Sequence, residues 1–337
     1  MRIGNNPEKN NTILQIDSYH RVIIPIYIPN LSEDYFKDGL KILSLCIDSL
    51  LKTIHEKTRI SLVDNGCCAE VVSYLNELYH TEPKVDQLLN SRVNLGKVNA
   101  LYAIIKSNLE PVITISDADV MFLPNWQQEV ETVLQNFPEA GMVSPVPSSK
   151  GYGGLYLNST IYYGLFKGKI RFGKVQDPDG MVKFQESIGR TMYEPIHLEK
   201  YLTLENKKSK VVLGCGHFVA TFRAEVFESG PQEVCQHKIV GGSENKYLDI
   251  PNDKAGYLRV ATLGNYAYHL GNIHEKWMDD KMEMINSTAN LGGMMDSLPK
   301  AKPLNKLQYL IGKVFHLLLF RKFKKFYFSL KGMKTSF

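Results

Sequence analysis

The chain has 337 residues and a formal net charge of +5 at pH 7, with the composition of a soluble globular protein. This length suits one large α/β domain with additions, or two domains, and no apolar run approaches the roughly 20 residues that a transmembrane helix needs. The charge is uneven: residues 297–337 contain ten Lys or Arg and no Asp or Glu, so the first 296 residues carry −5. This asymmetry predicts an anionic partner for the tail.

The start of the chain and its cysteines predict the compartment. Residues 1–18 form a polar, flexible leader without the apolar core of a signal peptide. The five cysteines are odd in number and contain no CxxC spacing, so we expect free thiols in a reducing environment. Both observations predict a protein made and kept in the cytoplasm.

Strands and helices alternate along the first half of the chain. Strands are predicted over residues 21–28, 59–63, 84–89 and 112–115, and helices over about 32–56, 67–79 and 98–107. A β-α-β-α-β-α-β order predicts an α/β fold with a mostly parallel sheet and helices on both faces.

The second half is less regular. Residues 125–137 have the pattern of a helix and 141–146 that of a strand, whereas 147–210 show no clean period. We expect loops and short elements there, either an acceptor-binding lid or a peripheral subdomain with aromatic core positions. After that, predicted strands, a Gly-rich turn and short helices occupy residues 211–228, and strands occupy 257–262 and 266–270. A helix should begin at Ser243 as N-cap, after Gly241 and Gly242, and stop at Gly256.

Asp117 and Asp119 follow the strand over residues 112–115 at the point where it should end. Side chains two apart on extended backbone share a face, so the two carboxylates converge at a strand's carboxyl end. Ligands bind at that edge of open α/β sheets, and paired carboxylates suit a divalent cation that keeps positions free for phosphate oxygens. The alternative is a solvated acidic turn.

Polar residues also follow the neighbouring strands. Asp64 and Asn65 end the second strand, and Asn94, Lys97 and Asn99 follow the third. Each alone is typical of a turn, but parallel strands place their carboxyl ends along one edge. Together these residues predict a single ligand-binding crevice.

Six segments, taken in order, resemble family 2 glycosyltransferases of the Rossmann-like GT-A fold. They are VIIPIYIPN, SLVDNGC, NLGKVNALYAI, TISDADV, LGCGHFVATFRAEVFE and SENKYLDIPNDKAGY, which together span about residues 20–275. The resemblance implies transfer of a sugar from a nucleotide-sugar to an acceptor hydroxyl, usually with inversion and with Mn²⁺ or Mg²⁺.

The resemblance also implies roles for individual residues. The nucleotide-sugar donor would be held by Pro25, Tyr27, Asp64, Asn65, Asn94, Gly96, Lys97 and Asp117. Asp64 would hydrogen-bond the base, Asp117 would face the ribose and the metal, and Asp119 would be the direct metal ligand. A bound cation would stabilise the negative charge that develops on the leaving diphosphate.

For the acceptor side, Glu244 is the candidate general base, because it matches the first acidic residue of the family's Glu-Asp motif. Asn245 replaces the second acidic residue, so Asp249 is an alternative base and inversion is less secure. A purely structural reading of Glu244 is an acidic residue at a helix N-terminus.

Other residues near this side have implied roles. His269 could bind the metal, with His274 as competitor and a structural role as the third possibility. Gly214, Gly216 and His217 would shape the acceptor side, with glycine allowing close backbone approach.

The tail has the pattern of a basic amphipathic helix. In residues 304–331, apolar side chains recur at i, i+3 and i+4 spacing among lysines and an arginine: Leu307, Leu310, Ile311, Val314, Phe315, Leu318 and Leu319. Such a helix suits an anionic membrane surface. The alternatives are a helix docked on the sheet or a basic face for nucleic acid, and we expect no nucleic-acid partner.

These observations predict three parts: the leader, a catalytic domain over 19–275 with a nucleotide-binding half (19–146) and an acceptor half (147–275), and a basic tail over 276–337. The predicted function is a metal-dependent glycosyltransferase at the inner membrane face. It would use a UDP- or GDP-sugar and a glycan or lipid-linked acceptor in bacterial surface polysaccharide synthesis. A sugar nucleotidyltransferase and a non-catalytic binding protein are the alternatives; the first lacks a Gly-rich phosphate loop after the first strand.

Overall fold

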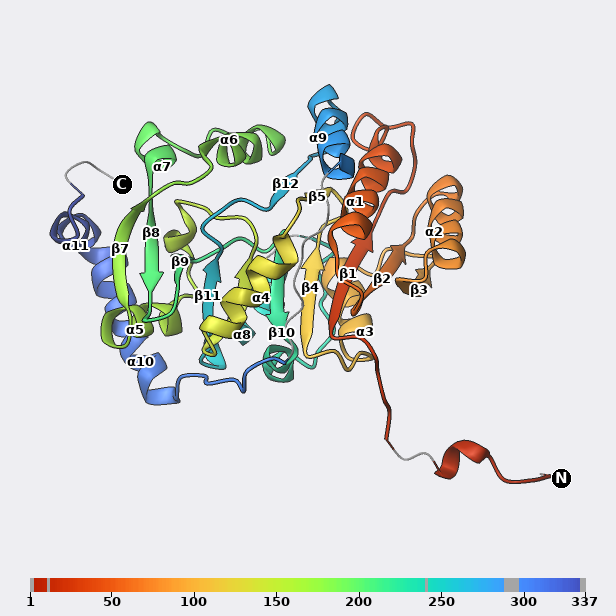
Figure 1. The fold of residues 1–337 in the computed structure, drawn as a ribbon, viewed down its shortest axis with the longest axis horizontal. Coiled ribbons are helices and arrows are strands. Elements are labelled where there is room, and N and C mark those ends of the chain that lie inside the picture. The colour runs from red at the N-terminus through yellow and green to blue at the C-terminus, as the bar shows by residue number, and fades with distance from the viewer. Residues whose placement is uncertain (1–2, 11–12, 240–241, 288–296, 334–337) are drawn as a thin grey trace.

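The computed structural model describes residues 3–10, 13–239, 242–287 and 297–333. Within them the chain forms a ten-stranded sheet in the order β3-β2-β1-β4-β10-β6-β11-β9-β8-β7 and a small β12-β5 sheet (Figure 1). The strands are β1 His20–Ile26, β2 Thr58–Asn65, β3 Val85–Ser91, β4 Val112–Ser116, β5 Val120–Phe122, β6 Ala140–Ser144, β7 Lys169–Lys174, β8 Lys200–Glu205, β9 Lys210–Leu213, β10 Val219–Arg223, β11 Leu258–Ala261 and β12 Ala267–His269.

The α-helices are α1 Gly39–Thr53, α2 Ala69–Thr81, α3 Lys97–Ile105, α4 Trp126–Asn136, α5 Asn158–Phe166, α6 Pro178–Ser187, α7 Pro195–Glu199, α8 Ile250–Lys254, α9 Lys276–Ser287, α10 Lys306–Phe315 and α11 Lys324–Leu330. Short 3₁₀ turns are η1 Pro7–Asn10, η2 Gly151–Gly153 and η3 Ala224–Ser229, and π-helical turns are η4 Asn245–Asp249 and η5 His316–Lys322.

The sheet is mostly parallel, as predicted. β1 pairs in parallel with β2 and β4, and β3 extends this set, while β6 and β11 also pair in parallel. Strands β10, β9, β8 and β7 pair only antiparallel with their neighbours. The four parallel strands come from the β-α alternation of the first half of the chain.

Helices cover both faces of the sheet, which confirms the α/β prediction. In β1, Val22 and Ile24 pack in one core with α1, α2 and α4, whereas Ile23 packs on the opposite face with α3. All three side chains are fully buried. An apolar strand covered on both faces is the expected sequence of a central parallel strand.

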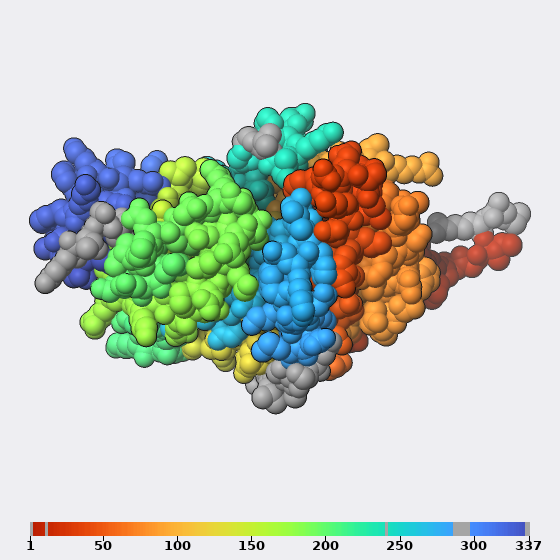
Figure 2. Space-filling model, turned by 90° about the horizontal axis from the view of Figure 1, so that it is seen from above, coloured from red at the N-terminus to blue at the C-terminus, as the bar shows by residue number. Residues whose placement is uncertain are grey.

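The carboxyl ends of β1, β2 and β4 lie at the upper edge of the sheet in Figure 1, beneath the small β5–β12 sheet. Figure 2 looks onto this edge, where α1, α9, the 160–210 segment and residues 230–239 and 242–250 meet. Segments far apart in sequence therefore surround the strand ends.

Residues 147–210 form short helices and strands joined by loops. β7 and β8 form an antiparallel pair that extends the main sheet beyond β9, and α5 packs beside β7 and β11. Tyr163 and Tyr201 are buried there, as in the predicted aromatic subdomain. The expected loops and short elements are confirmed, because these helices and strands are five to ten residues long. Strand β7 was not predicted individually because it is an edge strand, in which the exposed Lys169 and Arg171 interrupt the apolar pattern.

Three local predictions can be compared directly. β9 and β10 flank the Gly-rich turn as predicted, although each pairs with other strands. Gly256 ends its helix with φ +89°, as predicted. Ser243 is helical and buried, and its Oγ has no hydrogen-bond partner among the described residues, so the N-cap prediction was wrong. Gly241 lies outside the described residues.

The five cysteines are free thiols, as predicted.

The tail, residues 297–333, docks on the rest of the fold and contains α10, η5 and α11 in place of one continuous α-helix. α10 packs on α5, and Phe320, Tyr327 and Phe328 join the main core. The predicted apolar stripe splits: Ile311, Phe315 and Leu319 are half-buried, whereas the other members are exposed. Within the described part of the chain, no helix has both the length and the apolar character to cross a membrane.

Candidate active site

Asp117 and Asp119 lie at the carboxyl end of β4, where the sequence predicts them. Backbone hydrogen bonds fix this turn from two sides: the Asp117 N–H donates to Phe218 O (2.7 Å), and the Leu270 N–H donates to Asp119 O (2.7 Å). The two aspartate side chains are 27% and 31% exposed, respectively. Both carboxylates are therefore preorganised and partly open to a ligand.

His269, rather than His274, lies beside the aspartates. Its Nε2 is 3.5 Å from Asp119 Oδ2, and its Nδ1 is 2.9 Å from Ser187 Oγ, whereas His274 pairs with Asp279 (3.0 Å). Burial raises the pKa of Asp119 to about 6, opposed by His269, and Asp119 Oδ1 lacks a hydrogen-bond partner among the described residues. Carboxylate oxygens with an imidazole fit a divalent cation such as Mn²⁺.

Lys97 connects the aspartates to the predicted base. At the start of α3, its Nζ forms ion pairs with Asp117 Oδ1 and Glu244 Oε1. Burial alone would lower the pKa of Lys97, but the two carboxylates raise it, so the side chain is a fixed ammonium ion. Lys97, Asp117 and Glu244, which the sequence predicts as site residues from three separate segments, are therefore in contact.

The loop before Lys97 is held by the predicted asparagines. Asn65 Nδ2 donates to Asn94 Oδ1 (3.1 Å), Asn65 Oδ1 accepts from the Leu95 N–H (2.8 Å), and Asn94 Oδ1 accepts from the Gly96 N–H (2.8 Å). Gly96 has φ +82°, and a Cβ there would lie 3.0 Å from the backbone of Lys238. These contacts order the loop, and Gly96 allows the backbone of His237 and Lys238 to approach it.

Glu244 stands on a helix that runs from residue 243 through η4 and α8. Pro251 has no N–H to donate to the Tyr247 carbonyl, and the turn ahead of it has π-helical bonding, with the Ile250 N–H donating to Asn245 O. The Tyr247 carbonyl accepts a hydrogen bond from Tyr102 Oη (2.6 Å) instead. Since Tyr102 belongs to α3, this bond joins the helix of Glu244 to the helix of Lys97.

His217 bridges the two candidate bases. Glu244 precedes the π-helical turn and Asp249 ends it, and both carboxylates face this imidazole. Its Nε2 is 3.4 Å from Glu244 Oε2 and its Nδ1 is 3.3 Å from Asp249 Oδ2, while Arg259 Nη1 lies 2.9 Å from the same Asp249 oxygen. Asp249 is 1% exposed and Glu244 20%.

The pKa values follow from these contacts. Burial would lower the pKa of His217, but Asp249 and Glu244 raise it to about 9. Burial would raise the pKa of Glu244, but His217 and Lys97 lower it to about 2. At neutral pH, therefore, His217 is an imidazolium and Glu244 a carboxylate. We call the following set the edge cluster: Lys97, Asp117, Asp119, His217, Glu244, Asp249, Arg259 and His269.

The remaining predicted donor residues line the ends of β1 and β2. Pro25 lies in β1, and Tyr27 just beyond it is 43% exposed with its ring edge-on to Phe36 (6.1 Å). Asp64 is buried at the end of β2, and its Oδ1 accepts the N–H of Gly66 (3.1 Å) and of Cys67 (2.8 Å). Tyr27 is thus available to a ligand, whereas Asp64 also orders its own turn.

The two glycines of the acceptor side differ. A Cβ on Gly214 would lie 2.3 Å from Gly151 O, and its φ is +80°, so this position requires glycine. A Cβ on Gly216 would meet only Phe218 Cδ1, at 3.7 Å. The neighbouring protein atoms therefore leave room for a side chain at position 216, and the expected close approach of this backbone on the acceptor side stays a prediction.

Sequence reasoning missed two contributors to the site. Arg259 is a buried cation in β11, and its signal was a single charged residue within an apolar strand. Phe184 and Phe218 stack at 5.2 Å, and each meets His269 edge-on. Nothing in the sequence pairs these two rings, because they come from segments 34 residues apart that only the fold brings together.

A second group of potential metal ligands lies elsewhere. His20, His55 and Glu131 are buried, with one ligand atom of each within 4.8 Å of the others. His20 begins β1, so this group belongs to the opposite edge of the sheet from the edge cluster. Glu131 Oε1 lies 2.8 Å from His20 Nδ1 and 3.1 Å from His55 Nε2, so the three already bond one another.

Comparison with known proteins decides the family. The sequence profile described as glycosyl transferase family 2 matches residues 22–228, more than half of the chain. The chain belongs to this family. The glycosyltransferase thus has all the predicted donor-binding residues, Asp119 and the glycine-rich turn inside the matched region, while Glu244 and His269 lie beyond it. The match favours sugar transfer over the nucleotidyltransferase and binding-protein alternatives.

Solved structures resemble this glycosyltransferase only distantly. They include a mannosyltransferase, PcManGT, from Pyrobaculum calidifontis in complex with GDP-Man and Mn²⁺ (14% identity, TM-score 0.44, covering 90% of this chain and 71% of that one). TarS residues 1–349 from S. aureus has 11% identity and a TM-score of 0.42, and the match covers 91% of this chain and 74% of that one. GalNAc-T7 with UDP, GalNAc and Mn²⁺ has 12% identity and a TM-score of 0.47, and the match covers 92% of this chain and 50% of that one. No curated protein sequence matches the chain.

Proposed function

We propose that this glycosyltransferase moves a sugar from a UDP- or GDP-sugar to an acceptor hydroxyl in a reaction that requires Mn²⁺ or Mg²⁺. The observation that carries the proposal is the edge cluster, in which Lys97 joins Asp117 to Glu244 beside Asp119 and His269. Four carboxylates there face three permanent or imidazolium cations, Lys97, His217 and Arg259. That balance favours one further cation.

Asp119 and His269 would hold the metal, together with Asp117. Two observations support this assignment: Asp119 Oδ1 has no hydrogen-bond partner in the part of the chain that the structure describes, and the side chain is partly exposed. The metal would supply charge stabilisation for the departing diphosphate. Tyr27 and the Asp64–Asn65 strand end would hold the nucleoside, because they lie at the same edge and Tyr27 presents an exposed ring.

Glu244 is the better candidate for the general base. Asp249 is buried and paired with Arg259, so it has no access to an acceptor hydroxyl. Glu244 is partly exposed, but with a pKa of about 2 it is a weak base in this arrangement. A donor diphosphate offers Lys97 another anionic partner, which would release Glu244 from that ammonium ion and raise its basicity. Asp249 would then act as a positioning residue, through His217.

A carboxylate base at the attacking hydroxyl agrees with inversion at the anomeric carbon, which we include in the proposal. We assign Gly214, Gly216 and His217 to the acceptor side because they adjoin Glu244 through His217. The acceptor would be a glycan or a lipid-linked sugar of a bacterial surface polysaccharide.

The tail supports a position at the cytoplasmic face of the membrane. On α10 and η5, apolar side chains remain exposed after docking: Leu307 67%, Leu310 46%, Val314 56%, Leu317 63% and Leu318 37%. Lysines alternate with them, and the segment has no acidic residue. A basic, apolar outer face suits an anionic membrane. The variant L310E/V314E should lose vesicle binding while its donor binding stays unchanged.

A two-step experiment tests the proposed activity. Thermal-shift measurements with UDP-, GDP- and CMP-sugars, with and without Mn²⁺, should find a donor that stabilises the protein only with the metal. Transfer of the radiolabelled sugar from that donor to a glycan acceptor is then measured. Release of pyrophosphate from a nucleoside triphosphate would instead favour nucleotidyl transfer, and stabilisation without turnover on any acceptor would favour a binding protein.

A further inference from the structure

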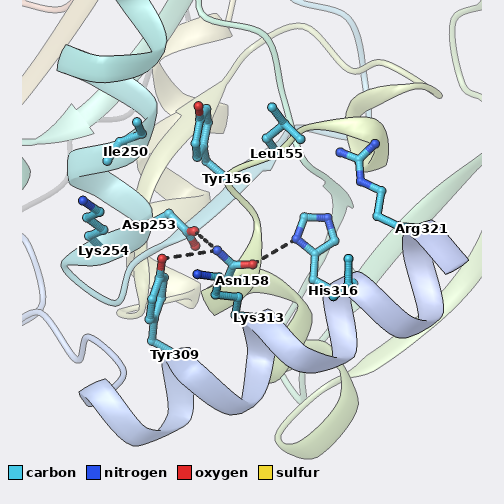
Figure 3. A pocket seen from close by; sticks show the side chains of 11 residues that line it. Leu155, Tyr156, Asn158, Ile250, Asp253, Lys254, Tyr309, Lys313, His316 and Arg321 are labelled. Atoms are coloured by element: carbon cyan, nitrogen blue, oxygen red, sulfur yellow. Dashed lines mark hydrogen bonds between the residues drawn. The ribbon is translucent and has the colours of Figure 1, made fainter.

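A cavity of about 600 Å³ lies between the docked tail and the catalytic domain, apart from the edge cluster (Figure 3). Its walls come from the segment before α5, from α8, and from α10 and η5. In Figure 3 the side chains of Tyr309 and His316 point from the tail helix toward Asn158 and Asp253 of the domain. The tail therefore completes this cavity by docking.

The floor of the cavity is preformed. A Cβ on Gly312 would lie 2.0 Å from Asn158 O, so glycine lets α10 touch α5. Asn158 Nδ2 donates to Asp253 Oδ2 (2.6 Å), and His316 Nδ1 lies 3.0 Å from Asn158 Oδ1. These three polar side chains are at least nine-tenths buried. His316 Nε2, on the other edge of the ring, has no hydrogen-bond partner among the described residues.

The rim of the cavity is cationic. Lys254, Lys313 and Arg321 line it, and none forms an ion pair within 4.0 Å with a carboxylate of the described residues. The one carboxylate of the lining, Asp253, is 1% exposed and accepts hydrogen bonds from Asn158 and from the Ser159 N–H (2.9 Å). Three cations against one covered carboxylate favour an anionic ligand.

The same rim is apolar on its outer side. Leu155 and Leu317 both line the cavity and are each 63% exposed. Leu317 also belongs to the outer face of the tail, so the apolar surface continues from the cavity mouth onto that face. A ligand with an anionic head and an apolar body would satisfy both parts, which a free ion would not.

We propose that this cavity binds the phosphate headgroup of an anionic membrane lipid. The inference rests on the membrane position proposed above and adds a specific lipid site to it. Arg321 is already oriented, because its Nη2 donates to Gly153 O (2.8 Å) and Gly154 O (3.3 Å). Lys313, Leu317 and Arg321 follow at four-residue spacing, so they present their side chains along one side of the helix.

The site would also orient the enzyme. Lys254 ends the helix that carries Glu244, ten residues earlier, and ten residues of helix span about 15 Å. A lipid headgroup bound at Lys254 would therefore fix the height and angle of the edge cluster relative to the membrane surface. This placement suits transfer to an acceptor that is itself held in the membrane.

The test compares two variants of equal net charge in the full-length protein. K254Q/K313Q/R321Q removes the three cations of the cavity, and K306Q/K322Q/K325Q removes three tail lysines that do not line it. Binding to vesicles of phosphatidylcholine with phosphatidylglycerol is measured by co-sedimentation. We expect the cavity variant to bind at least roughly tenfold more weakly than the control, and pure phosphatidylcholine to bind neither. Equal losses in the two variants would overturn the proposal, since general charge attraction would then explain binding.

Two further arms keep the result interpretable. The single variant R321Q should lose vesicle binding, whereas R321K, which retains the charge, should keep most of the binding of the wild type. The melting temperatures of all variants show whether each is folded. Inorganic phosphate at matched ionic strength should not displace wild-type protein from vesicles; displacement at millimolar phosphate would show a free-phosphate site instead. Donor-induced stabilisation is measured on the same variants, so failure of the lipid site and failure of the transferase proposal give different results.

Discussion

The two edges of the sheet each hold a compact group of charged side chains, but the groups are built differently. At the amino-terminal edge, His20, His55 and Glu131 are at most 9% exposed and bond one another. At the carboxyl edge, Asp117, Asp119 and Glu244 of the edge cluster are 20–31% exposed.

The difference teaches which group is structural. Burial lowers the pKa of His20, while His20 and His55, against the effect of burial, lower the pKa of Glu131 to about 2. That group therefore joins α4 to the start of β1. Its three side chains are at most 9% exposed, so it is closed to a substrate. The edge cluster instead keeps partly exposed carboxylates, which is the arrangement that a substrate and a cation can complete.

The largest effect should come from Asp119→Ala. Loss of the cation's charge stabilisation should lower transfer by about 10³-fold or more, because that stabilisation amounts to several kcal/mol and each tenfold costs about 1.4 kcal/mol. Initial rates of sugar transfer measure this, and circular dichroism checks the fold. If Asp119→Ala kept the full transfer rate and no longer responded to Mn²⁺, the assignment of Asp119 as a metal ligand for catalysis would be contradicted.

Replacing the proposed base should have the next largest effect. Glu244→Gln keeps size and polarity, so transfer should fall by roughly 10²–10⁴-fold while the donor dissociation constant changes little. Asp249→Asn is the matched comparison, since it disturbs the Arg259 pair and should lower both the melting temperature and the activity. If Asp249→Asn instead lowered transfer without lowering the melting temperature, and Glu244→Gln lowered both, Asp249 would be the base.

The amino-terminal edge should respond in stability alone. Glu131→Ala leaves two buried histidines without their hydrogen-bond acceptor, and each unsatisfied buried donor costs about 1–3 kcal/mol. Urea unfolding should show this loss, while activity per folded molecule remains that of the wild type. Gln135→Ala, at an exposed position of the same helix, is the control. A loss of metal-dependent activity per folded molecule in Glu131→Ala would mean that the catalytic metal is bound at the amino-terminal edge, against this account.

The smallest effect concerns pH. His217 has a folded-state pKa of about 9, above its ordinary 6.5, so its charge stabilises the fold fully below pH 6.5 and the contribution is lost as pH rises through 9. This rise in pKa limits the contribution of His217 to the free energy of unfolding to about 3 kcal/mol. The melting-temperature difference between wild type and His217→Gln should therefore shrink between pH 6.5 and 9. A constant difference would mean that His217 is neutral.

The parallel half of the fold could be predicted from sequence because its signals are local. Buried strands such as β1 and β4 are continuous β-branched runs, and turn residues mark their ends, so Asp117 and Asp119 were placed correctly at the edge. The His269 position also followed from a predicted strand, which the structure has as β12.

The rest depended on contacts that no local pattern contains. The tail docks through Gly312, His316 and Phe320, spaced four apart, and a search for apolar residues overlooks the glycine and the histidine. The π-helical turn before Pro251 and the Arg259–Asp249 pair likewise arise from the tertiary fold. Choosing between Glu244 and Asp249 needed their exposures, which sequence does not give.

The central claim is that Asp119 at the carboxyl edge of the sheet holds a cation against a nucleotide-sugar. The most direct measurement is the rise in melting temperature that a nucleotide-sugar causes with and without Mn²⁺, in wild type, Asp119→Asn and Glu131→Gln. The account predicts a metal-dependent rise in wild type and in the Glu131 variant, and none in the Asp119 variant. An equal metal-dependent rise in all three proteins would contradict it.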